Sequence, residues 1–183
     1  MKTHLKALIV TILVFFLLVG LYYSFTSNKQ NASDQRKPVI DAKLVLPQSD
    51  LKTLSHGKLN LEQFADKIII FNFWASWCAP CIEEVPSLIT LVKADTNIVV
   101  IAVSGDQNKD DIHAFLKSFP GFNKPPIYVV QENMKALMDH FKVDKLPESF
   151  IFNPKGEMVK KISGTINWHT PESIEYFKVI RSQ

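Results

Sequence analysis

The sequence predicts an α/β fold in which a mixed central sheet carries helices on both of its faces. Strand-like apolar runs alternate with amphipathic helices along the middle of the chain, and the alternation ends in a hairpin and one last helix. Alternation of this kind favours parallel strands whose connecting helices cover the sheet. The hairpin adds antiparallel strands, and we therefore expect a mixed sheet.

The first strand–helix unit has the clearest pattern. Residues 67–73, KIIIFNF, form a short run of β-branched and aromatic side chains, which is typical of a buried strand. Pro80 falls in the first turn of a helix predicted over residues 79–94, where its missing N–H group does no harm. The apolar residues of this helix recur at spacings of three and four: Ile82, Val85, Leu88, Ile89 and Val92.

The rest of the chain continues this pattern and then changes it. Two more strand–helix pairs are expected, at residues 97–105, 106–119, 125–131 and 132–141. Residues 148–153 and 158–163 are expected to form two strands joined by a PKGE turn, which indicates a hairpin. A closing helix is predicted over residues 170–182, with Thr170 as its cap and Pro171 at its first position.

Composition separates three segments: an apolar N-terminal segment (residues 1–25), a polar linker (residues 26–40) and a folded domain (residues 41–183). The formal net charge of +3 comes from the first two segments, whose only acidic residue is Asp34 and whose basic residues are Lys2, Lys6, Lys29, Arg36 and Lys37. Acidic and basic side chains nearly balance in the domain. This balance does not indicate a nucleic-acid-binding surface.

The N-terminal segment has the properties of a membrane anchor. Residues 7–23 carry no charged side chain, and the uncharged run extends through Phe25. At about 1.5 Å per residue, a helix over this run just crosses a hydrocarbon core of roughly 30 Å. A cleaved signal peptide is the competing interpretation, because the chain begins with the basic MKTHLK, but the segment lacks a good small-x-small cleavage site. We expect an uncleaved signal anchor that exports the domain behind it.

Cys78 and Cys81 are the only cysteines of the chain, and three uses compete for them. A structural zinc site needs four ligands, and the five histidines are scattered singly along the sequence. An inert disulfide across a two-residue gap would constrain the unfolded chain very little, because the benefit grows with loop length. The third use is redox chemistry, for which no metal or other cofactor is expected.

Redox chemistry has a physical basis at this position. Cys78 lies at a strand-to-helix junction, where unpaired N–H groups and the positive end of the helix dipole favour its thiolate. Such a thiolate can attack a disulfide and form a mixed disulfide with a partner. Cys81, one helical turn later, is placed to attack that mixed disulfide and release the partner reduced.

The segment FNFWASWCAPCIEEVPSL, residues 71–88, resembles the active-site segment of the thioredoxin fold. It is most similar to the membrane-anchored, extracytoplasmic branch that includes the TlpA, ResA and DsbE/CcmG-type thiol-disulfide oxidoreductases. The motif of that branch is Phe/Trp-Ala-x-Trp-Cys-x-Pro-Cys-x-x-Glu-x-Pro, and Trp74 to Pro86 supply every fixed position. The resemblance covers about residues 41–181 and implies a thioredoxin-like fold.

The resemblance also implies roles for the site residues. It implies a redox disulfide between Cys78 and Cys81, with Cys78 as the exposed attacking thiol and Cys81 as the buried resolving thiol. Glu84 matches an acidic residue that tunes thiol protonation in the family; the alternative is a solvent-facing helix carboxylate like Glu83. Asn72 stands where cytosolic thioredoxins keep a buried Asp, which makes Glu84 the better acid–base candidate.

A second landmark is KLPESFIF, residues 145–152. Pro147 matches the family's cis-proline, which faces the cysteine pair and leaves neighbouring backbone groups free for an extended substrate. The alternative is a trans proline that starts an edge strand. With Trp77 as a surface contact, Pro147 and Glu148 are the predicted substrate-binding residues. Lys145 replaces the glycine that cytochrome c maturation members usually carry, which is a departure from that subgroup.

The resemblance implies an enzyme that reduces disulfides of extracytoplasmic proteins, such as apo-cytochrome c, so that cytochrome c biogenesis is the expected setting. A membrane electron donor would re-reduce the enzyme, and the chain would be a single-pass protein of a bacterial inner membrane with its domain on the periplasmic side. The alternatives are a thiol oxidase or isomerase and a Cu(I) metallochaperone, for which His169 is the nearby extra ligand. A peroxiredoxin-type peroxidase is disfavoured, because its Thr-x-x-Cys motif would need Thr where Ala75 stands.

Overall fold

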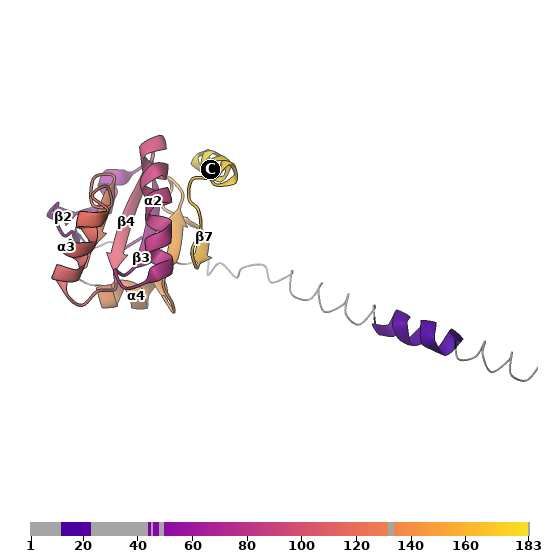
Figure 1. Ribbon diagram of the computed structural model, residues 1–183. Coiled ribbons are helices and arrows are strands. Elements are labelled where there is room, and N and C mark those ends of the chain that lie inside the picture. The colour runs from indigo at the N-terminus through magenta and orange to yellow at the C-terminus, as the bar shows by residue number, and fades with distance from the viewer. Residues whose placement is uncertain (1–11, 23–43, 45, 48–49, 132–133, 183) are drawn as a thin grey trace, which may run out of the picture. The chain divides into compact units, whose positions relative to one another are not determined.

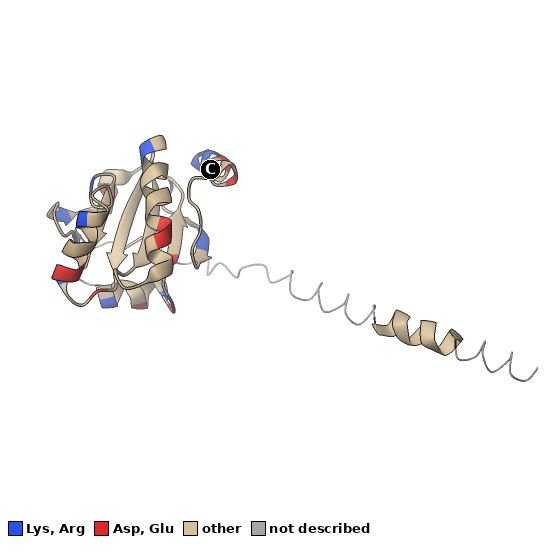
Figure 2. Cartoon of the chain, in the orientation of Figure 1, with Lys and Arg blue, Asp and Glu red and all other residues tan. Residues whose placement is uncertain are grey.

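The computed structural model describes residues 12–22, 44, 46–47, 50–131 and 134–182, and the chain divides into two compact units, Met1–Val39 and Ile40–Gln183. In the first unit, residues 12–22 form a helix that carries no charged residue (Figure 2). The remainder of the expected anchor and the whole of the expected linker lie outside the described residues. Among the residues that are described, no helix combines the length and the apolar character needed to cross a bilayer.

Five strands form the central sheet of the second unit, in the order β5-β4-β3-β6-β7. The parallel strands are β3 (Ile68–Trp74), β4 (Ile98–Ser104) and β5 (Ile127–Val130). The antiparallel strands are β6 (Glu148–Phe152) and β7 (Met158–Ser163). The predicted mixed sheet is confirmed, and the strand ends agree with the expected ranges to within two residues.

Helices cover both faces of this sheet, as the sequence predicts (Figure 1). One face carries α2 (Ala79–Ala94), α3 (Lys109–Ser118) and α5 (Pro171–Arg181). The other face carries α4 (Met134–Phe141) and the short 3-10 helix η1 (Leu61–Phe64). Successive residues of β3 point to opposite faces, so that its side chains alternate between the two cores. The first core receives Ile68, Ile70 and Trp74, and the second receives Ile69, Phe71 and Phe73.

The segment before β3 contains elements that the sequence pattern did not predict. Strands β1 (Leu51–Lys52) and β2 (Lys58–Leu59) pair antiparallel, and η1 follows them. Thr53 pairs with Val130 in an isolated bridge, which ties this small sheet to the edge strand β5. Strands of two residues are too short to show a period of two, and this explains why the pattern gave no sign of them.

Local signals set the starts of the helices. The side chain of Thr170 caps α5 by accepting a hydrogen bond from the Ser173 N–H, with Pro171 at the first position, as predicted. The cap of α2 is Cys78 itself. The cysteine pair therefore sits where β3 ends and α2 begins, at the carboxyl end of the parallel strands.

Candidate active site

Cys78 and Cys81 form a disulfide at the junction of β3 and α2. The Cys81 N–H donates to Cys78 Sγ at 3.3 Å, so that one donor of the helix start is directed at this sulfur. Cys78 is 6% exposed and Cys81 is not exposed at all. The expected exposure of Cys78 is therefore wrong for this oxidised form, in which the residue is nearly buried. Cys78 is bonded to the buried Cys81 and its sulfur caps α2, although the residue is the more accessible of the two.

A surface groove of about 530 Å³ runs past Cys78. Trp77 and Cys78 line one part of it, and Met138, Val143 and Leu146 contribute apolar side chains. Trp77 is 70% exposed, which is the surface position that the sequence predicts for it. Of the two cysteines, Cys78 lines this groove and Cys81 does not.

The second landmark segment borders this groove. The peptide bond between Leu146 and Pro147 is cis, which confirms the predicted isomer. Pro147 itself is buried, and its carbonyl oxygen accepts a hydrogen bond from the Gly164 N–H at 2.8 Å, so that this oxygen is already engaged. Lys145 and Leu146, which come just before Pro147, are the members of the segment that line the groove.

Glu148 is not brought into the groove with Trp77. Its side chain is buried and accepts a hydrogen bond from Ser163 Oγ at 2.5 Å, and Lys161 Nζ lies 3.1 Å from its Oε2. The Asp144 N–H also donates to this carboxylate, at 3.4 Å. The carboxylate thus ties residues 144–148 to β7, and its placement does not support the expected contact between this side chain and a substrate.

Glu84 lies one helical turn after Cys81 and is 2% exposed. The alternative interpretation of a solvent-facing carboxylate is therefore wrong for Glu84, although it does describe the exposed Glu83. Asn72 Nδ2 donates to Glu84 Oε1 at 2.7 Å and to Ser149 Oγ at 3.0 Å. Asn72, which stands in place of a buried Asp and so made Glu84 the better acid–base candidate, is thus in direct contact with Glu84.

Burial raises the pKa of Glu84 to about 7, because a charged carboxylate loses its hydration in this position. The hydrogen bond from Asn72, the backbone of Ile166 and the indole of Trp168 favour the charged form and oppose this rise in pKa without cancelling it. The structure therefore holds a carboxyl group that can gain or lose a proton near neutral pH, one turn away from the disulfide.

Trp168, to which the sequence pattern assigned no role, is buried close to Glu84. Its Nε1 has no hydrogen-bond partner among the described residues, although the indole favours the charged form of Glu84. Ser87 links the two segments, because its hydroxyl donates to the Glu84 carbonyl at 2.7 Å and accepts from the Trp168 N–H at 3.1 Å. No local pattern marks such a contact between residues far apart in the chain.

Sequence reasoning also missed Asp106, a buried residue just after β4 whose carboxylate accepts hydrogen bonds from Ser76. One signal could have indicated it. Residues 67–73 and 97–105 were both expected to form strands, and in the structure β3 and β4 are neighbours, with Trp74 opposite Ser104 at their carboxyl ends. The polar residues that follow two adjacent parallel strands meet at the same edge of the sheet.

Within the described part of the chain, no three His, Cys, Asp or Glu side chains gather in a way that could hold a metal ion. His169, considered as an extra copper ligand, is exposed, and its N–H donates to Asn167 Oδ1 at 3.0 Å. The chemistry that this geometry supports is exchange at the Cys78–Cys81 disulfide, which has the buried carboxyl group of Glu84 one turn further along α2.

Comparison with known protein families and sequences gives consistent results. The family model described as thioredoxin-like matches residues 66–158, just over half of the chain. The thiol-disulfide oxidoreductase ResA of Bacillus subtilis (strain 168) is 29% identical over 168 residues, which cover 91% of this chain and 89% of ResA. The sporulation thiol-disulfide oxidoreductase A of the same organism is 26% identical over 152 residues, or 80% of this chain and 85% of that protein.

Solved structures show the same fold. A putative thiol:disulfide interchange protein DsbE from Chlorobium tepidum superposes with a TM-score of 0.64 and 20% identity, covering 75% of this chain and 95% of that one. StoA from Bacillus subtilis superposes with a TM-score of 0.57 and 23% identity, covering 72% of this chain and 99% of that one.

Proposed function

The chain belongs to the thioredoxin-like family and is a protein-disulfide oxidoreductase, and from this premise we propose that it reduces disulfides of proteins outside the cytoplasm. The observation that carries the proposal is the Cys78–Cys81 disulfide at the start of α2, with the buried carboxyl of Glu84 one turn behind it. The proposed substrates are cysteine pairs of the Cys-x-x-Cys-His type, which serve haem attachment in apo-cytochrome c.

The proposed reaction is dithiol–disulfide exchange in two steps. The Cys78 thiolate of the reduced enzyme attacks one substrate sulfur, the substrate S–S bond breaks, and the departing substrate thiolate takes up a proton. Deprotonated Cys81 then attacks the Cys78 sulfur of the mixed disulfide, which forms the Cys78–Cys81 bond and releases the second substrate thiolate. Counted from the dithiol enzyme to the dithiol substrate, two electrons and two protons are transferred, because Cys78 and Cys81 each lose a proton and each substrate sulfur takes one up.

Glu84 is proposed to act in the second step. Cys81 is not exposed, so that water is poorly placed to take the proton that this thiol must lose before it attacks. Glu84 follows Cys81 by three residues on the same buried face of α2, and its pKa of about 7 suits proton transfer near neutral pH. We therefore assign Glu84 as the proton acceptor for Cys81.

The N-terminal segment is proposed to anchor the chain, as a single-pass protein, in a bacterial cytoplasmic membrane with the domain on the extracytoplasmic side. The uncharged run over residues 7–23 supports this, as do the large apolar side chains of the helix at residues 12–22, nine of which are 46–66% exposed. A membrane-bound electron donor would then return the disulfide to the dithiol. The full chain should sediment with membranes in high salt, and a chain that begins at residue 40 should not. Full-length protein in the soluble fraction would contradict the anchor.

Trapping tests the exchange reaction. A reduced Cys81→Ser variant mixed with an oxidised synthetic peptide that carries one Cys-x-x-Cys-His disulfide should accumulate a mixed disulfide through Cys78, because the resolving thiol is missing. Mass spectrometry identifies the linked cysteine. The Cys78→Ser variant is the matched control, and equal trapping by both variants would show that Cys78 is not the attacking residue.

The redox potential tests the direction of electron flow. A reductase should have a Cys78–Cys81 potential nearer to that of thioredoxin, about −270 mV, than to that of the oxidant DsbA, about −120 mV. Equilibration with glutathione or dithiothreitol buffers measures it. A value close to that of DsbA would favour an oxidase instead.

A further inference from the structure

The loop that leads from β3 to Cys78 rests on a buried carboxylate outside the cysteine motif. We propose that Asp106 is a positioning residue, which holds this loop so that Trp77 and Cys78 present one fixed surface to a partner disulfide. The inference rests on the proposed exchange reaction at Cys78, and it adds a residue that acts on partner recognition without touching the reacting sulfurs.

Asp106 engages both donors of Ser76, the residue immediately before Trp77. The Ser76 N–H lies 3.2 Å from Asp106 Oδ1 and 3.0 Å from Oδ2, and the Ser76 hydroxyl lies 2.6 Å from Oδ1. The hydroxyl of Ser104 donates to Oδ2 at 2.7 Å. Because Asp106 is 2% exposed, donors of the protein rather than bulk water hold its carboxylate.

The backbone of Asp106 is itself held in place. Its N–H donates to Ser104 Oγ at 3.0 Å, and its carbonyl accepts from Gln131 Nε2 at 3.1 Å. Ser104 is the last residue of β4, and Gln131 follows β5. The Gly105 N–H also donates to the Trp74 carbonyl at 2.7 Å. Asp106 thus joins the loop after β3 to the ends of β4 and β5.

The hydrogen bonds of Asp106 hold the backbone next to Trp77. Trp77 is 70% exposed, so that core packing cannot fix its position. The residue after Trp77, Cys78, donates its N–H to the Ala75 carbonyl at 3.2 Å. The residue before it, Ser76, is held by Asp106. The exposed indole therefore stands on a backbone that is fixed at both ends. A preformed contact surface lowers the cost of ordering a loop when a partner binds.

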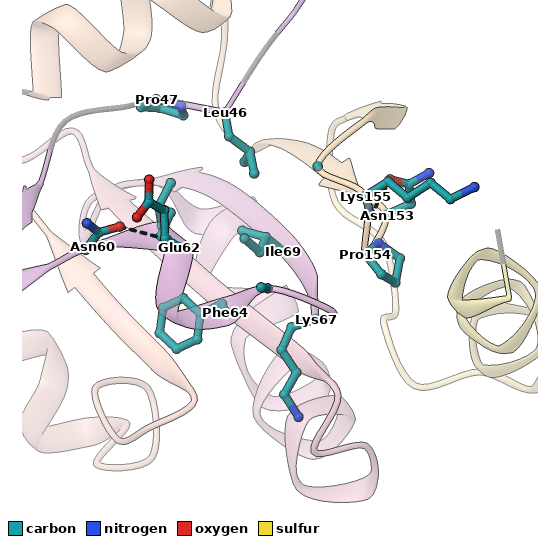
Figure 3. A pocket seen from close by; sticks show the side chains of 13 residues that line it. Leu46, Pro47, Asn60, Glu62, Phe64, Lys67, Ile69, Asn153, Pro154 and Lys155 are labelled. Atoms are coloured by element: carbon teal, nitrogen blue, oxygen red, sulfur yellow. Dashed lines mark hydrogen bonds between the residues drawn. The ribbon is translucent and has the colours of Figure 1, made fainter.

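Asn153 offers a matched comparison for a purely structural role. It is also 2% exposed, and its side chain also holds a loop, because Asn153 Oδ1 accepts from the N–H groups of Lys155 and Glu157 at 3.1 and 2.9 Å. Figure 3 shows Asn153 with Pro154 and Lys155 at one side of a pocket of about 240 Å³, and neither cysteine lines that pocket.

Asp106 and Asn153 lie at opposite ends of the sheet. Phe152, just before Asn153, pairs with Ile69 near the start of β3, whereas Ser104 pairs with Trp74 at the end of that strand. An Asn153→Ala variant therefore reports what the loss of a buried loop-holding side chain does to the enzyme when the loop is far from the groove.

The test measures the two steps of exchange separately in wild type, Asp106→Asn and Asn153→Ala. Formation of the mixed disulfide with the oxidised Cys-x-x-Cys-His peptide is followed by stopped flow in a Cys81→Ser background, where this species accumulates. Resolution is followed with Cys81 intact. Asp106→Asn should lower the second-order rate of formation about tenfold, with a smaller effect on resolution, because a misplaced loop weakens encounter with the partner. Asn153→Ala should change formation by less than about twofold, although it loses hydrogen bonds of similar burial.

Two results would overturn the proposal: equal formation rates in Asp106→Asn and Asn153→Ala, or a loss in Asp106→Asn that falls equally on formation and resolution. If Asp106→Asn does not fold, Ser76→Ala decides the question, because it removes the hydroxyl donor and keeps the N–H. It should slow formation about threefold, and an unchanged rate would overturn the proposal. A wild-type enzyme that forms no mixed disulfide with the peptide would instead refute the proposed reaction, so the two failures can be told apart.

Discussion

Glu84 and Asp106 are equally buried, each 2% exposed, but their surroundings differ. Glu84 accepts a hydrogen bond from Asn72, and burial raises its pKa to about 7. Asp106 accepts from the N–H and hydroxyl of Ser76 and from the hydroxyl of Ser104. Burial alone therefore does not decide what a carboxyl group does. The pKa of Glu84 lies near neutral pH, which suits proton exchange, whereas the carboxylate of Asp106 engages both the N–H and the hydroxyl of one loop residue, Ser76, which suits it to holding the backbone.

The largest effect is expected when Glu84 is substituted, and it falls on the rate at which Cys81 resolves the mixed disulfide. Glu84→Gln keeps the shape of the side chain and removes its proton site, and it should slow the attack of Cys81 on the mixed disulfide about a hundredfold at pH 7. In wild type this rate should rise as the pH passes through about 7, where Glu84 loses its proton, and the variant should lose that inflection. Stopped-flow release of reduced peptide measures both.

The exposed neighbour Glu83 provides the matched control for this experiment. Glu83→Gln removes the same charge from the same turn of α2 and should leave the rate and its pH dependence close to wild type. If Glu84→Gln also stayed within about threefold of wild type, the acid–base role would be lost, since general acid–base catalysis contributes about a hundredfold or more.

Stability should respond to pH through the same residue. The pKa of Glu84 rises from an ordinary 4.5 to about 7 on folding, so that the folded state binds more protons between these values. The free energy of unfolding therefore falls as pH rises through this window, and the full cost is present above it. The difference in free energy of unfolding between Glu84→Gln and wild type should therefore change in favour of the variant by about 3 kcal/mol from pH 4 to pH 9. Urea unfolding of the oxidised proteins measures this, and an equal difference at both pH values would contradict the raised pKa.

Removing the charge of Asp106 should lower the stability of the fold, whereas removing that of Glu84 should raise it. Asp106→Asn replaces one acceptor oxygen by an amide donor, which leaves a donor of Ser76 or Ser104 without a partner in a buried place. We expect the free energy of unfolding to fall by about 2 kcal/mol at pH 7, again by urea unfolding. A variant that matched or exceeded wild-type stability would mean that the two carboxyls are not different in kind.

The smallest expected effect comes from Trp168. The indole favours the charged form of Glu84, so that Trp168→Phe should move the pKa of Glu84 further upward and shift the inflection of the resolution step to higher pH. Trp74→Phe removes another buried indole N–H that lacks a hydrogen-bond partner among the described residues, and it should leave the inflection in place. Equal shifts in both variants would assign the effect to core packing.

The β3–α2 unit could be predicted from the sequence because each of its signals is local. The apolar run of β3, the spacing on α2 and the proline in its first turn are all properties of consecutive residues. The same holds for the cap of α5 and for the hairpin turn. The cis bond before Pro147 was also predictable, although only through the family resemblance.

Contacts between distant residues could not be predicted in this way. Glu148 was expected to face a substrate because it follows the cis-proline, but its carboxylate contacts Lys161 and Ser163 on β7. Trp168 carried no local signal and Asp106 carried only its place just after a predicted strand, because the partners of both residues come from other elements. Such roles depend on which polar groups the fold brings together, and a linear pattern does not contain that information.

The contact between Asn72 and Glu84, at 2.7 Å, also has a consequence for evolution. By the resemblance, cytosolic thioredoxins carry a buried Asp at the position of Asn72. Asn72→Asp made first would place two carboxyl groups side by side in a buried site, where one would have to stay protonated. Glu84→Gln made first would leave two amides and no acid. One single substitution therefore gives the site a second carboxyl group and the other leaves it with none, so we expect the effects of substitutions at positions 72 and 84 to depend on each other.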